Sequence, residues 1–176
     1  MPIDRRALLR ALAISTPIAL ATAYNNYLVW VIAGFPLGTV PPRSELSLGV
    51  VLLWRLASIL LYALYLLYGG LYVWFFLRHG NQLSSGRAAL GGALTGLIPA
   101  VITRLLYLIS DRSDAEAFLA QFLAAHPTYP EERARAIAAL ATALSFIFTV
   151  TIRVLLSASG AAIYAGMMRR RVARQR

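Results

Sequence analysis

The sequence predicts an all-α membrane protein: a four-helix transmembrane bundle with a short amphipathic interfacial helix between spans three and four. Of its 176 residues, 59% are hydrophobic and only 14% are charged, whereas a soluble domain carries about 25% charged residues. Four apolar stretches are each long enough to cross a hydrocarbon core of about 30 Å. Most of the arginines collect at the ends of these stretches, as expected for membrane helices. The whole chain, 1–176, is predicted to form a single integral membrane domain.

The first predicted span covers about residues 11–33. It follows a basic start that contains Arg5, Arg6 and Arg10. The segment Ala21-Thr22-Ala23 resembles a signal-peptide cleavage site. Because the apolar pattern continues beyond it to Ala33, we favour an uncleaved span.

The second and third spans are predicted at about 48–77 and 88–109, joined by a short polar loop. An aromatic cluster at 72–76 followed by Arg78 ends the second span, which is typical of an anchor at the membrane interface. The fourth helix is predicted to start near Pro130, with Glu131 and Glu132 in its first turn. Its apolar part covers about 137–168.

The interfacial helix is predicted at about 113–125. Ser113 and Glu116 have the spacing of a capping box. Phe118, Leu119, Phe122 and Leu123 then fall on one helical face before His126-Pro127 ends the element. This helix either lies on the membrane surface or packs over the mouth of the bundle, and the sequence leaves both arrangements open.

The distribution of arginines predicts the orientation. Ten of them lie in the N-terminal tail, the 78–87 loop and the C-terminal tail, against four in the other two loops. Positive charge favours the cytoplasmic side, so both termini are expected in the cytoplasm of a bacterium, with the chain in its cytoplasmic (inner) membrane.

Three arginines, Arg55, Arg104 and Arg153, lie within the spans, and no acidic residue does. Counted from the cytoplasmic flanks at 1.5 Å per residue, Arg104 and Arg153 sit about 24–25 Å up their helices. Asn25 and Asn26 reach a similar depth in the first span. The sequence therefore predicts a shared polar layer in the outer part of the membrane.

This layer has two interpretations. In the first, the arginines extend to the headgroups or pair with acids of the outer loops, which is a structural role. In the second, Asn25, Asn26, Arg104 and Arg153 line a small outward-facing polar vestibule that attracts an anionic group. The first is the default for an arginine close to the interface.

Small residues recur at every fourth position in the last two spans, a pattern that lets helices approach closely. They are predicted to pack helices within one bundle in preference to dimerisation. The residues are Gly92, Gly96, Ala100, Ala158, Ala162 and Gly166.

Signatures of an enzyme are missing from the sequence. The chain has no cysteine and no lysine, and its two histidines fall in loops on opposite predicted sides. Carboxylates are confined to the N-terminal tail and the outer loops. We therefore expect no catalysis, no cofactor and no metal. We also expect no nucleic-acid partner, because the positive charge flanks the membrane spans. The expected partner is the lipid bilayer.

The stretch from Arg78 to Arg171 resembles an uncharacterised family of small four-span bacterial membrane proteins, known as a domain of unknown function. The shared features are a polar loop at 80–86, a glycine-rich start at 91–97, an acidic amphipathic insert at 114–123 and a Pro130-Glu131-Glu132 start. The resemblance implies a four-helix integral membrane protein and supplies no activity and no site residues.

Two functions remain open. In the first, the chain is a structural or accessory component that packs against another membrane protein. In the second, it binds or moves a small anionic or amphiphilic solute through the outward vestibule. Since four spans are few for a transporter, the second function predicts a homo-oligomer.

Overall fold

The long apolar stretches in the described part of the chain form helices. The computed structural model describes residues 3–23, 31–32, 34, 46–78, 84–110, 119–120 and 122–174. Within these ranges there are four long helices and no strand: α1 (Arg5–Ala23), α3 (Leu48–Arg78), α4 (Ser85–Ser110) and α6 (Glu131–Arg174). A continuous helix satisfies its own backbone hydrogen bonds, which a lipid environment requires.

The helix starts are set by local polar groups. One carboxylate oxygen of Asp4 accepts hydrogen bonds from the backbone N–H groups of Arg6 and Ala7 at 2.9 and 3.1 Å, which caps α1. The hydroxyl of Ser84 accepts from Arg87 N–H at the start of α4, at 3.4 Å. Helix α6 begins directly after Pro130 with two glutamates in its first turn, as the sequence predicts.

Three of the helices are long and apolar enough to cross a membrane. They are α3, the 85–106 part of α4 and the 131–170 part of α6, with mean hydropathies of 2.1, 1.6 and 2.0 over their best windows. The chain is therefore of the membrane class. Of the first predicted span, residues 24–30 and 33 lie outside the described part.

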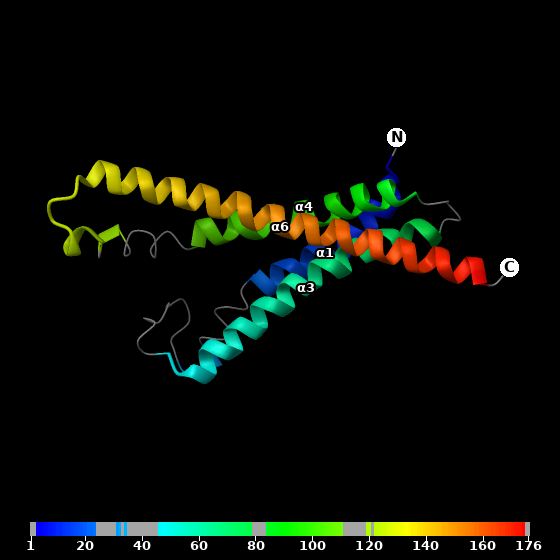
Figure 1. Cartoon of the computed structure of the whole chain (residues 1–176), viewed down its shortest axis with the longest axis horizontal. Coiled ribbons are helices and arrows are strands. Elements are labelled where there is room, and N and C mark those ends of the chain that lie inside the picture. The colour runs from blue at the N-terminus through cyan, green and yellow to red at the C-terminus, as the bar shows by residue number, and fades with distance from the viewer. Residues whose placement is uncertain are drawn as a thin grey trace.

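The long helices pack with both ends of the chain at one end of the molecule (Figure 1). Helix α6 packs against α4 and α3, and α1 packs against α4 and α3. The α4–α6 interface is the most extensive of these. Helices α4 and α6 are antiparallel, so the start of α4 lies beside the end of α6, where Arg169 donates a hydrogen bond to the hydroxyl of Ser85 at 2.8 Å.

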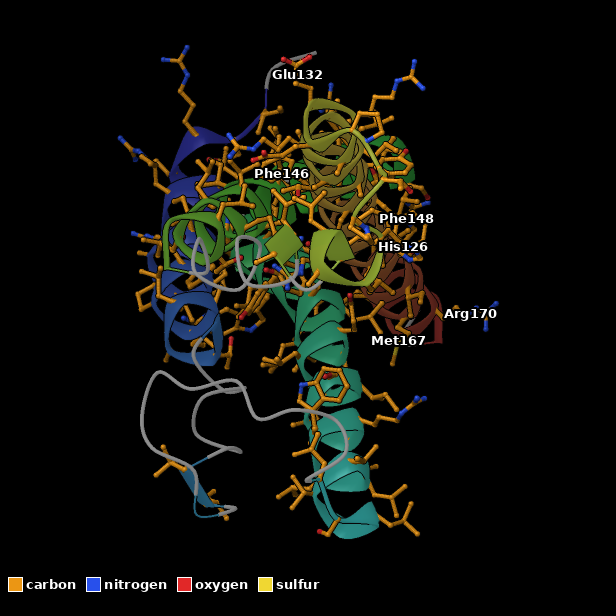
Figure 2. The ribbon with its side chains drawn as sticks, turned by 90° about the vertical axis from the view of Figure 1, so that its left-hand side faces the viewer. His126, Glu132, Phe146, Phe148, Met167 and Arg170 are labelled. Atoms are coloured by element: carbon orange, nitrogen blue, oxygen red, sulfur yellow. The ribbon has the colours of Figure 1, made fainter. Side chains whose placement is uncertain are left out.

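Helix α3 diverges from the other helices toward its start. Its buried side chains begin only at Tyr65 and continue to Phe76, while Leu56 and Leu60 are 58% and 67% exposed. The early turns of α3 extend below α1, α4 and α6 in Figure 2. The protein core therefore occupies the half of the molecule that contains both termini.

The segment before α6 is described only in part. Residues 119–120 and 122–125 are helical, and the chain turns at 127–129 after His126. The His126 N–H donates to the Phe122 carbonyl at 3.0 Å, and the rings of Phe122 and Tyr129 meet edge to face. The capping box expected at Ser113–Glu116 lies outside the described residues.

Candidate functional site

The α4–α6 seam is built from small residues on both helices. Helix α4 contributes Gly92, Gly96 and Ala100, and α6 contributes Ser157 and Ala161, all of them buried. The Ser157 hydroxyl donates a hydrogen bond to the Gly92 carbonyl at 2.7 Å. Small side chains bring the two backbones close enough for this bond, which is the usual way membrane helices associate.

The seam leaves no room for larger side chains. A Cβ built on Gly96 would lie 2.5 Å from the Ser157 Cβ, and one on Gly92 would lie too close to the Ala161 Cβ. On the other side of α6, a Cβ on Gly160 would overlap the Leu66 carbonyl of α3. Helix α6 is therefore held tightly between α3 and α4.

An arginine continues each small-residue stripe. Arg104 follows Ala100 by four residues on α4, and Arg153 precedes Ser157 by four residues on α6. Because the helices are antiparallel, both arginines lie at the same end of the seam, toward the start of α6. The close packing ends where these two large side chains begin.

The Arg153 guanidinium lies at the junction of three helices. It donates a hydrogen bond to the Thr103 hydroxyl of α4 at 2.9 Å, and that hydroxyl in turn donates to the Ala100 carbonyl at 3.1 Å. The guanidinium carbon also lies 5.2 Å from the ring centroid of Tyr65 and 6.0 Å from that of Tyr62, both on α3. This is within reach of a cation–π interaction.

Arg153 retains unused hydrogen-bonding capacity. A guanidinium has five N–H donors. Among the described residues, the buried Arg153 Nε has no hydrogen-bond partner and no carboxylate forms an ion pair with the guanidinium. An ion pair within these ranges joins Arg135 to Glu131 at 2.6 Å, with both side chains exposed. An anion beside Arg153 would satisfy both its charge and its free donors.

Arg104 reaches in the same direction along the seam. The pairing of Gly92 with Ala161 and of Gly96 with Ser157 places Arg104 level with Thr149. Its guanidinium nevertheless donates to the hydroxyl of Ser145, one turn nearer the start of α6, at 2.8 Å. Both arginines thus extend away from the small-residue end of the seam.

Beyond Arg104 the seam widens into an open, mostly apolar groove. The cavity has a volume of about 580 Å³, within the range of small-molecule sites. It lies between α4 and α6, and α6 supplies most of its wall. The lining residues are Leu108, Leu119, Arg135, Ala138, Ala139, Thr142, Ala143, Phe146 and Ile147.

The structure brings together two of the four residues predicted to line the vestibule. Arg104 and Arg153 are brought to one end of the seam, whereas Asn25 and Asn26 lie outside the described residues. Gly92 and Gly96 face α6, and Ala100 is buried in one cluster with Tyr65 of α3 and Val150 of α6.

On α6 the closest contacts use Ser157 and Ala161, and the Ala158 Cα would lie 3.4 Å from a Cβ built on Gly92. The predicted stripe Ala158, Ala162 and Gly166 lies one position further along the helix and is half-buried. A Cβ built on Gly166 would have no neighbour within 4 Å.

Sequence reasoning missed the polar residues that hold the arginines in place. These are Thr103 and Ser145, together with the seam residue Ser157. A signal for Ser157 does exist, because Arg153, Ser157, Ala161 and Ala165 form a four-residue repeat. Thr103 and Ser145 carry no such signal, because a single hydroxyl in a membrane helix commonly bonds its own backbone.

Comparisons with protein-family models, with curated proteins and with solved structures find no match for this chain. Within the described ranges, no three His, Cys, Asp or Glu side chains lie close enough together to hold a metal ion.

Proposed function

We propose that this chain is a non-enzymatic integral membrane protein that binds the anionic group of a small or amphiphilic solute. The observation that carries the proposal is the Arg153 guanidinium, held by Thr103 and Tyr65 without a carboxylate partner among the described residues. A charge within a membrane span is costly and marks a functional site unless it is paired or reaches water. A bound anion would supply the missing counter-charge.

The proposal includes four spans in a bacterial cytoplasmic membrane, with both termini in the cytoplasm. Its support is the gathering of positive charge at one end of the molecule. Arg78, Arg87 and Arg169 lie in the parts of α3, α4 and α6 at the end that also carries both termini. With this orientation Arg104, 19 residues beyond Ser85, lies about 28 Å up α4 and therefore near the outer boundary of the membrane.

A structural or accessory role is the second candidate, favoured by the length of the apolar surface on α6. Large apolar side chains are exposed from Ile137 to Met167, which is about 45 Å of helix. A bilayer core of about 30 Å covers only part of this length unless the helix tilts strongly. A second copy of the chain or another membrane protein would cover the remainder.

The binding proposal is tested by thermal unfolding of the protein in lipid nanodiscs. Dodecyl phosphate is expected to raise the midpoint of unfolding, and dodecyl phosphocholine to have little effect, because the latter carries no net charge. Arg153→Leu should remove the response, and Arg153→Lys should keep part of it. Arg133→Leu, which removes an exposed cation near the start of α6, serves as the control.

Equal responses of the wild type and Arg153→Leu would contradict binding at this position. The size of the protein particle in nanodiscs gives a second measurement. A strict monomer argues against transport of the solute by a homo-oligomer. A stable complex with one membrane protein, together with no response to anions, favours the accessory role.

A further inference from the structure

The groove beside the two arginines has the form of a site for an apolar chain. One wall is the face of α6 that carries Ala139, Ala143 and Phe146, and Leu108 of α4 forms part of the other. Alanines on α6 leave a channel that larger side chains would fill. Leu119, from the segment that precedes α6, contributes to the lining of the same groove.

A polar pair, Arg104 and Ser145, lies beside the part of this groove that is nearest the seam, outside the groove lining. Leu108 follows Arg104 by one turn of α4, and Thr142 precedes Ser145 by three residues of α6. The hydrogen bond between Arg104 and Ser145 therefore lies where the groove meets the small-residue seam. The hydrogen bond between Arg153 and Thr103 lies further along the same seam, nearer to Gly96 and Ser157.

A cation at the end of an apolar channel matches a ligand with one charged end and one alkyl chain. We propose that the α4–α6 groove binds a single-chain anionic amphiphile. Its phosphate or carboxylate head lies at Arg104 and Arg153, and its alkyl chain lies along Ala143 and Ala139. This inference rests on the proposed function. It adds the chemical class of the ligand and the position of the ligand's alkyl chain.

Charge complementarity favours this occupant over an uncharged chain. The outer end of the groove also carries a cation, Arg135, but Glu131 pairs with it. Arg104 and Arg153 lie on the seam side of the groove, outside its lining. Arg153 has no carboxylate in an ion pair with it among the described residues. The head of the ligand is therefore expected at the inner end.

A chain-length series tests the inference with the full-length protein in lipid nanodiscs. The probes are inorganic phosphate and alkyl phosphates with two, six and ten carbons, used below their micelle concentrations. Affinity is expected to rise with chain length, by up to about fourfold for each added methylene that the groove covers. Constant affinity across the series would overturn the inference.

Two groove variants separate the chain from the head. Ala143→Trp fills the channel and should remove the gain from longer chains while inorganic phosphate still binds. Ala141→Trp, at an exposed position outside the groove lining, is the matched control and should leave the series unchanged. An unaltered series in Ala143→Trp would exclude the groove as the chain site.

The head position is tested with Arg104→Leu and Arg104→Lys. Loss of one charge-assisted hydrogen bond should weaken every member of the series by about tenfold in Arg104→Leu and by less in Arg104→Lys. Binding of phosphate with no dependence on chain length would overturn this inference alone. The absence of any binding, including that of phosphate, would overturn the proposed function as well.

Discussion

The guanidinium of Arg153 on α6 donates a hydrogen bond to the Thr103 hydroxyl on α4 at 2.9 Å. This bond lies where the close packing of α4 against α6 ends. On one side of it the helices meet through Gly96 and Ser157, and on the other side they separate around a groove of about 580 Å³. The seam is thus both a rigid support and one end of a candidate binding site.

The glycine at 160 should be essential for close packing of α6 on α3. In Gly160→Ala the new Cβ overlaps the Leu66 carbonyl, so the helices must separate at a cost of about 1–3 kcal/mol. Gly166→Ala is the matched control, because its Cβ meets no atom within 4 Å. It should stabilise the helix by up to about 1 kcal/mol. Unfolding in mixed detergent measures both, and equal effects would contradict the packing.

The buried hydroxyl of Ser157 should contribute measurably to stability. Ser157→Ala removes the hydrogen bond to the Gly92 carbonyl, and such bonds contribute about 0.6 kcal/mol on average within membranes and up to about 1.7. Ser159→Ala, at an exposed position two residues along α6, should change stability by less. The same unfolding assay compares them, and a larger loss in Ser159→Ala would argue against the seam.

The orientation can be tested cleanly because the chain contains no cysteine. Thr128→Cys places a thiol at an exposed turn before α6, and Ser84→Cys places one at the exposed start of α4. A membrane-impermeant maleimide added to intact cells should label Thr128→Cys and leave Ser84→Cys unlabelled until the cells are lysed. The reverse pattern would place both termini outside the cytoplasm.

Helix starts and the membrane class could be predicted because they depend on local chemistry. Pro130 with two following glutamates predicts that α6 starts near Pro130, and the helix begins at Glu131. The apolar length of α3 predicts its membrane character. Such signals need only neighbouring residues in the chain.

The contact face of α6 could not be predicted in the same way. Two adjacent stripes there, one through Ser157 and one through Ala158, are made of small residues at the same spacing. Local pattern favours neither, and the choice depends on how Gly69, Gly92 and Gly96 meet the helix. The divergence of α3 is hidden for a similar reason, because its early turns are apolar apart from Arg55 and Ser58 and resemble its packed turns in composition.

The most direct test of the account is the reactivity of a thiol at position 153. In Arg153→Cys, Arg104 still lies at the end of the seam, so an impermeant anionic methanethiosulfonate added from outside should react faster than a cationic one. Ser159→Cys, exposed at the middle of the span, should react with neither because lipid covers it. Faster reaction with the cationic reagent, or reaction only from the cytoplasmic side, would contradict an outward-facing anion site.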